Sequence, residues 1–186
     1  MSSSPRQKLS DDHRAVNEVL NELLTALHNK DVGVSLSRLD LLWARLAVHI
    51  RAEHLHLFPA VINRLTASRD AVAAPDLSEA QSVVAKLRAD HDFFMRKLAH
   101  SIGVLRELRR SVDSPEEEAK LNEVRDVVLE VSKRLENHNE IEENQIYRWT
   151  TTILTEPEQI ELATQIRAEL ETRPPRFSPE AWANHE

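Results

Sequence analysis

The chain contains 186 residues, carries a formal net charge of −7 and has no cysteine. Its length suffices for one domain with a sizeable core, and its negative charge argues against a nucleic-acid-binding surface. The lack of cysteine excludes disulfides, thiol catalysis and thiolate ligands, so the nine histidines and the carboxylates remain as metal donors.

The composition predicts an all-α protein. Only two glycines occur, helix-forming residues dominate, and no β-branched run alternates with period two. No segment has the unbroken apolar length of a membrane span, and the first ten residues do not have the pattern of a signal peptide. We therefore expect a cytoplasmic protein without nucleic-acid or membrane partners. The sequence leaves open whether it is a monomer or an oligomer.

The first part of the chain predicts two helices. Residues 1–8 are expected to be a flexible tail, and Ser10 or Asp11 can cap a first helix that ends near Lys30. A second helix is expected from about Ser35, with one continuous stripe at steps of three and four residues. This stripe consists of Leu39, Leu42, Leu46, His49, Glu53 and His56.

Two features separate the second helix from the third. Pro59 lacks a backbone N–H, which predicts that the second helix kinks or weakens there. Residues 66–77 predict a linker, after which Ser78 and Gln81 would form a capping box for the third helix. The inward stripe of the third helix consists of Val84, Leu87, His91, Phe94, Met95, Leu98, Ile102 and Leu105.

A fourth and a fifth helix follow. Ser114 before Pro115 is a strong start signal for the fourth helix. Its inward stripe consists of Leu121, Val124, Val128, Val131, Leu135, His138, Glu142 and Gln145. A shorter fifth helix is expected to begin between Thr155 and Glu158 and to end near Glu171.

Four long helices joined by short connections predict an up-down four-helix bundle with a shorter C-terminal fifth helix. We place the bundle at residues 9–150, and the last helix with a proline-containing tail at residues 151–186. An extended coiled coil is the alternative arrangement, and the linkers between the helices disfavour it.

The two halves of the chain repeat one pattern. DHRAVNEVLNEL, which begins at Asp12, resembles DHDFFMRKLAHS, which begins at Asp90. HIRAEHLHLFP, which begins at His49, resembles HNEIEENQIYR, which begins at His138. Each half therefore contains a helix with one histidine and then a helix with His-x-x-x-Glu, and two matching hairpins can point both sets into one interior.

The His-x-x-x-Glu spacing suits a metal site. Four residues turn a helix by about 400°, so the two side chains lie about 40° apart on one face and about 6 Å apart along the axis. A carboxylate has two oxygens and can bridge two metals, and such sites form in the interior of helix bundles. Each of these side chains taken singly could be a core or surface residue, but burial of the whole set without a metal would be unfavourable.

These motifs resemble those of the hemerythrin-like (HHE cation-binding) family over roughly residues 9–150. The resemblance implies a non-haem di-iron centre, with two iron ions (Fe2+/Fe3+) and an oxo or hydroxo bridge, that binds O2, peroxide or NO. It implies that Glu53 and Glu142 bridge the irons. The terminal ligands that it implies are His13 and His49 at one iron, and His91 and His138 at the other.

The chain departs from the family pattern in its third helix. Oxygen-carrying members have a fifth histidine one turn after the third-helix histidine, where this chain has Met95. With six-coordinate irons, this departure leaves one open position on each metal, which favours reaction or sensing over oxygen storage. Phe94 is expected to wall the pocket and His54 to lie beside the site. Three roles are open for His56: it can be a metal ligand, a proton donor to bound peroxide, or a surface residue.

The donor types favour one metal over the others. Carboxylate bridges with imidazoles suit iron or manganese better than zinc, which prefers four ligands. We expect an iron protein that handles peroxide and oxidative stress, with catalase-like or oxidase-like turnover. The first alternative is a protein that senses or binds oxygen, NO or iron without turnover, and the second is a metal-free interaction bundle.

Overall fold

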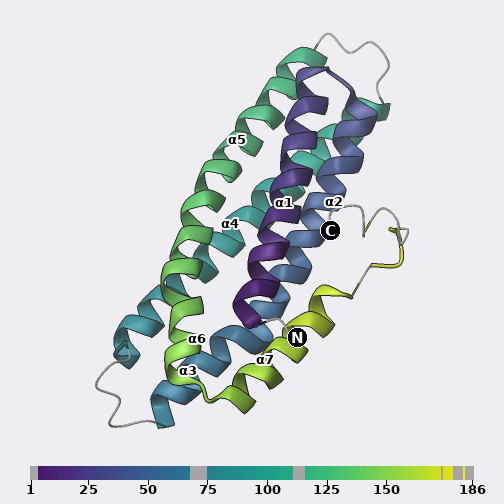
Figure 1. Cartoon of the computed structure of the whole chain (residues 1–186). Coiled ribbons are helices and arrows are strands. Elements are labelled where there is room, and N and C mark those ends of the chain that lie inside the picture. The colour runs from purple at the N-terminus through teal and green to yellow at the C-terminus, as the bar shows by residue number, and fades with distance from the viewer. Residues whose placement is uncertain (1–3, 68–74, 111–115, 173, 178–181, 183–186) are drawn as a thin grey trace.

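Helices form the whole framework of the described chain (Figure 1). The structure, a computed structural model, describes residues 4–67, 75–110, 116–172, 174–177 and 182. Within these residues there is no strand, and no helix is both long and apolar enough to cross a membrane. The prediction of an all-α protein is therefore confirmed.

The long helices lie side by side in Figure 1, where α1 contacts α2 and α5, and α4 contacts the same two helices. Helix α7 packs against α1 and α2. The elements in chain order are α1 (Pro5–His28), α2 (Val32–Ala52), the π-helical turn η1 (Glu53–Leu57), α3 (Phe58–Ala67), α4 (Leu77–Arg110), α5 (Glu117–Ile141), the π-helical turn η2 (Glu142–Ile146), α6 (Tyr147–Ile153) and α7 (Glu156–Leu170).

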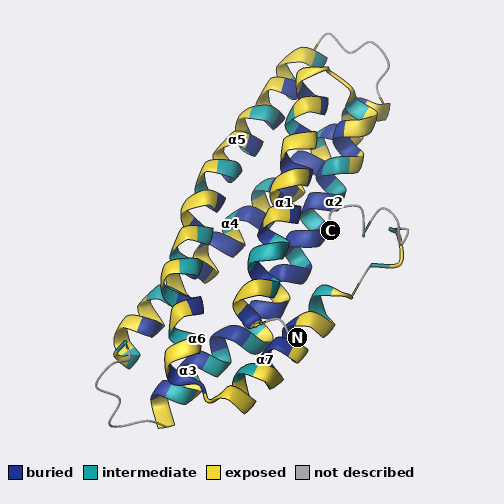
Figure 2. Ribbon diagram, in the orientation of Figure 1, coloured by how far each residue is buried: buried dark blue, intermediate teal, exposed yellow. Residues whose placement is uncertain are grey.

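The core consists of two apolar clusters with a polar layer between them, and the buried faces of the helices point toward one another (Figure 2). In α1, Leu9 belongs to one cluster and Val16 to the other, and the buried His13 lies between them. The same change from one cluster to the other occurs around three further buried histidines, which are His49, His91 and His138. The apolar stripes predicted from the sequence thus enclose a layer of imidazoles.

Helix α1 begins earlier than predicted. Its first residue is Pro5, and the side chain of Ser4 accepts a hydrogen bond from the backbone N–H of Gln7 at 3.2 Å. Proline is favoured in the first turn because it lacks a backbone N–H that would otherwise need a partner. Residues 5–8 are therefore helical, and the prediction that all of residues 1–8 form a flexible tail is wrong for them.

Two other helix starts are set by acidic caps that the sequence patterns did not single out. Asp31 Oδ1 accepts a hydrogen bond from Val34 N at 2.9 Å, and Asp76 Oδ1 accepts one from Glu79 N at 2.7 Å. A short carboxylate at this position satisfies an unpaired N–H of the first turn and favours the helix dipole. The capping role predicted for Ser78 is therefore wrong.

The starts predicted for the last two helices have different outcomes. Ser114 and Pro115 lie outside the described residues. The capping box before α7 is present, because Glu158 Oε2 accepts a hydrogen bond from the backbone N–H of Thr155 at 2.7 Å. The prediction that a helix opens at Thr155 is confirmed.

The irregularity predicted at Pro59 lies before it and has another cause. Helix α3 continues through Pro59, while the hydrogen-bond ladder widens in η1, where Phe58 N bonds to Glu53 O. The turn η2 has the same pattern, with Tyr147 N bonded to Glu142 O, although it contains no proline. Both turns begin at the glutamate of a His-x-x-x-Glu motif, so they belong to the repeated site, as π-helical turns often do.

Candidate metal centre

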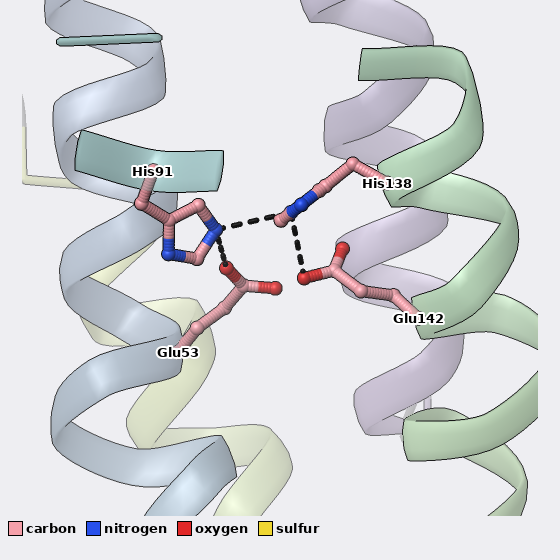
Figure 3. Close-up of side chains that lie close together, drawn as sticks. All are labelled: Glu53, His91, His138 and Glu142. Atoms are coloured by element: carbon pink, nitrogen blue, oxygen red, sulfur yellow. Dashed lines mark hydrogen bonds and ion pairs between the residues drawn. The ribbon is translucent and has the colours of Figure 1, made fainter. Parts of the chain in front are cut away.

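The six side chains predicted to bind metal meet inside the bundle, and all of them are buried. They come from α1, from α2 with η1, from α4, and from α5 with η2. Their donor atoms form two groups, within each of which the atoms lie within 4.8 Å of one another. One group is Glu53, His91, His138 and Glu142 (Figure 3), and the other is His13, His49 and Glu142.

Glu53 places its two carboxylate oxygens beside histidines of different groups. Its Oε1 lies 3.3 Å from His49 Nε2, and its Oε2 lies 3.2 Å from His91 Nε2. A single carboxylate therefore faces both groups, with one oxygen for each.

Glu142 repeats this arrangement from the opposite helix. Its Oε2 lies 3.2 Å from His13 Nε2, and its Oε1 lies 3.0 Å from His138 Nε2. The Nε2 atoms of His91 and His138 approach each other to 3.0 Å (Figure 3). Donor atoms of both glutamates and all four imidazoles thus converge on one small volume.

Several of these donor atoms have ion-pair contacts inside the cluster but no hydrogen bond. His49 Nε2, both carboxylate oxygens of Glu53 and Glu142 Oε1 are buried without a hydrogen bond among the described residues. An unpaired buried polar atom is destabilising by about 1–3 kcal/mol, and more if it is charged. A cation between them would satisfy all of these atoms, so the residues present fit a metal.

The imidazoles and carboxylates of the cluster shift one another's pKa. Burial alone would lower the pKa of His49, but the carboxylates of Glu53 and Asp12 outweigh burial and raise it well above its usual value. Burial alone would raise the pKa of Glu142, but the facing imidazoles of His138 and His13 hold it well below its usual value. The imidazoles and carboxylates therefore stabilise one another as oppositely charged groups.

The outer ring nitrogen of two histidines faces an aspartate from the neighbouring helix. His49 Nδ1 donates to Asp12 Oδ2 at 2.8 Å, and His138 Nδ1 lies 3.4 Å from Asp90 Oδ2. These aspartates directly precede the lone histidine of each half. By binding Nδ1, they turn Nε2 toward the cluster, and such partners raise the basicity of a metal-binding imidazole.

Each of these aspartates also faces an arginine one turn before the histidine of the His-x-x-x-Glu motif. Arg134 Nε donates to Asp90 Oδ1 at 2.6 Å, and an Nη atom of Arg45 lies 3.7 Å from Asp12 Oδ1. Both halves therefore contain an arginine–aspartate–histidine chain that ends at the cluster.

The lone histidines have outer partners that differ between the halves. His13 Nδ1 lies 3.3 Å from Glu143 Oε1, whereas His91 Nδ1 lies 2.9 Å from His54 Nε2. Glu143 and His54 are the residues that follow the two glutamates of the cluster. Burial, together with the nearby His91 and Arg88, lowers the pKa of His54, which favours its neutral form as an acceptor. One half thus has an anionic partner where the other has a neutral one.

Two aromatic rings flank the glutamate side of the cluster at equivalent positions of the repeat. The ring of Phe58 stacks on His91 at a centroid distance of 6.0 Å, and the ring of Tyr147 stacks on His13 at the same distance. The hydroxyl of Tyr147 donates to Glu142 Oε2 at 3.3 Å. Burial and the nearby carboxylates raise its pKa well above its usual value, so the phenol is neutral without metal.

A cavity of about 10 Å³ lies against the imidazoles. Its lining follows the repeat, because it consists of five pairs of equivalent residues from the two halves. The pairs are His13 with His91, His49 with His138, Val16 with Phe94, Leu46 with Leu135, and Ile50 with Asn139. The cavity has room for about one water-sized molecule and is mostly apolar apart from the imidazoles and one amide.

The three other residues expected near the site, besides His54, have different places. Phe94 lines the cavity and packs edge-on against His138 at a centroid distance of 5.4 Å. Met95 is partly buried against the apolar cluster and is not among the residues that line the cavity. His56 is in neither donor group and lies 3.9 Å from Glu169 of α7.

Other residues of the site were not predicted as functional, although the sequence contained a signal for most of them. The stretch R-L-x-x-H-x-x-x-E occurs in both halves and contains both arginines, and Asp-His occurs twice before the lone histidines. The side chains that contact the cluster and were not predicted are Asp12, Asp90, Glu143 and Tyr147, and Arg45 and Arg134 contact the two aspartates.

One comparison with known protein families agrees with this site. The model of one family, the hemerythrin HHE cation-binding domain, matches residues 4–150, which include all six clustered donors. A comparison with curated proteins finds no significant match. Because the family model covers most of the chain, the protein belongs to the hemerythrin HHE cation-binding domain family.

Proposed function

We propose that the protein holds two iron ions inside an up-down four-helix bundle and that it binds or reacts with O2, peroxide or NO there. One observation carries this proposal: Glu53 and Glu142 each direct one oxygen to each of the two donor groups. This is the arrangement expected of two bridging carboxylates, and imidazole with carboxylate suits iron. On this proposal His13 and His49 hold one iron, and His91 and His138 hold the other.

The chain itself would contribute binding, orientation and exclusion of water. Two iron ions bound here would supply positive charge, open coordination positions and reversible oxidation. Asp12 and Asp90 hold two of the imidazoles in place through Nδ1. Val16, Leu46 and Phe94 are among the apolar walls of the cavity, whose size limits the ligand to a few atoms.

Peroxide handling is the activity we favour. A site with net positive charge and open positions in an apolar cavity attracts small anions. The third-helix position of the fifth histidine of oxygen carriers is Met95, so this chain offers fewer imidazoles to fill the coordination sphere. Fewer protein ligands leave more room for peroxide to bind and react.

A sensor without turnover is the second candidate, and one contact chain favours it. The backbone carbonyl of Trp182 accepts a hydrogen bond from Arg45, and the Trp182 ring lies 5.0 Å from the guanidinium. Arg45 faces Asp12, and Asp12 binds His49. Trp182 is thus connected to a ligand of the cluster through Arg45 and Asp12, so a change of metal state at His49 can reach Trp182.

The test combines iron content with turnover. The chain is loaded anaerobically with Fe(II) and oxidised, and iron per chain, the optical spectrum and O2 release from peroxide are measured. We expect a ratio near two, bands of a bridged ferric pair, and turnover that Glu53→Ala abolishes. His100→Ala is the matched control, because His100 is exposed and pairs with Glu123 far from the cluster.

Two results would change the conclusion. A protein with less than one iron per chain after loading would refute the di-iron proposal. A full iron complement that changes its spectrum reversibly with NO or O2, but does not consume peroxide, would favour the sensor over the enzyme.

A further inference from the structure

The two donor groups are unequal in size. The group around His91 and His138 has four donors, because it includes both Glu53 and Glu142. The group around His13 has three, which are His13, His49 and Glu142, and Glu53 approaches it through Oε1, which lies 3.3 Å from His49 Nε2. With both glutamates as bridges, each metal position has two imidazoles and two carboxylate oxygens, and the position of His13 and His49 is the less tightly surrounded of the two.

The hydroxyl of Tyr147 lies beside two donors of this smaller group. Its oxygen is 3.3 Å from His13 Nε2 and 3.3 Å from Glu142 Oε2, and those two atoms are 3.2 Å apart. The three atoms therefore form a nearly equilateral triangle. For metal–ligand bonds of about 2.1 Å, two donors at right angles are about 3.0 Å apart. The triangle has nearly the size of one face of a metal's coordination octahedron.

We propose that Tyr147 is a seventh metal ligand, which binds as a phenolate to the metal held by His13, His49 and Glu142. This inference rests on the proposed function. When the bond forms, the hydroxyl proton leaves to solvent and an oxygen lone pair binds the metal. The positive charge of a bound metal favours the deprotonated form of an oxygen ligand.

The fold delivers this oxygen to one position only. Tyr147 follows η2 directly, and its backbone N–H bonds to the carbonyl of Glu142, which brings both side chains to the same metal position. Phe58 occupies the equivalent place after η1 and stacks on His91, but it has no hydroxyl. The two metals are therefore inequivalent: the protein fills one position that would otherwise be open, and external ligands bind at the metal of His91 and His138.

The chain allows an unambiguous test, because Tyr147 is its only tyrosine. The iron-loaded, oxidised protein is examined by visible absorption and resonance Raman spectroscopy. We expect a tyrosinate-to-Fe(III) charge-transfer band and enhanced ring modes that shift when ring-deuterated tyrosine is incorporated. Tyr147→Phe should lose the band and the modes while keeping two irons per chain.

Phe177→Tyr is the matched control, because it adds a phenol outside both donor groups and the cavity lining and leaves Tyr147 intact. It should retain the wild-type band. Azide titration adds a second readout: saturation is expected at one azide per metal pair in the wild type and at two in Tyr147→Phe.

The possible failures can be told apart. A wild-type protein with two irons and no tyrosinate band would overturn the assignment of Tyr147 and leave the proposed function standing. A protein that binds no iron would overturn both.

Discussion

Removal of the charge of Asp12 tests whether the aspartate–histidine contacts support the metal. Asp12→Asn keeps the size of the side chain and an acceptor oxygen but removes the negative charge that faces His49 at 2.8 Å. Loss of such an outer partner lowers metal affinity by about 10- to 100-fold, or about 1.4–2.8 kcal/mol. We therefore expect Asp12→Asn to lower the metal affinity by an amount in this range.

The same substitution at Asp90 should have a smaller effect. Asp90 lies 3.4 Å from His138 and binds Arg134 at 2.6 Å, so much of its charge is already compensated by the guanidinium. At Asp12 the arginine is farther away, at 3.7 Å. The loss of metal affinity for Asp90→Asn should therefore be about 10-fold or less.

Competition between the protein and a fluorescent chelator for Zn(II), a redox-inert probe, measures both effects. Asp126→Asn is the control, because Asp126 is exposed on α5 and should keep the wild-type affinity. An Asp12→Asn protein with wild-type affinity, or an Asp90→Asn protein that loses more, would refute the reasoning from these distances.

Three further predictions concern stability and access. The pKa of His49 in the folded protein lies well above the ordinary imidazole value of 6.5, so protonated His49 stabilises the metal-free fold below pH 6.5, and this contribution is lost as the pH rises through the folded pKa. Melting temperatures of the metal-free protein should therefore fall over this pH range, and His49→Gln should make that fall smaller. Val16→Phe should fill the cavity beside the imidazoles and weaken azide binding without loss of iron. Unchanged azide affinity would mean that external ligands do not bind in this cavity. Leu105→Ala, at a fully buried position, should lower the free energy of unfolding by about 2–5 kcal/mol in urea titrations and leave iron content unchanged, and a variant that loses iron in the folded state would contradict this.

The sequence by itself determined the helical class and the set of converging side chains. Its apolar stripes repeat at three and four residues, and this period places every member of a stripe on one face of a helix whatever lies opposite. His49 and Glu53 share such a stripe, as do His138 and Glu142, and two matching halves made a common interior a strong expectation. The structure brings these side chains together with His13 and His91.

The sequence predicted the faces of the helices better than it predicted backbone irregularities and helix starts. The sequence assigned a disturbance to Pro59, but both halves have a π-helical turn at the glutamate, with or without a proline. The sequence also set the start of α1 several residues late, because more than one polar residue near a helix start can act as a cap. Which of them does so depends on how the rest of the helix packs.

Only the tertiary structure decided which atoms surround the cluster. Tyr147 reaches His13, and His54 reaches His91, across helices that are far apart in the chain. Such contacts depend on the relative rotation and the axial register of neighbouring helices. The periodicity of one helix determines neither of them. The repeat therefore predicted two equal halves, and packing between the helices made them unequal, with a phenol and a carboxylate on one side and a phenyl ring and an imidazole on the other.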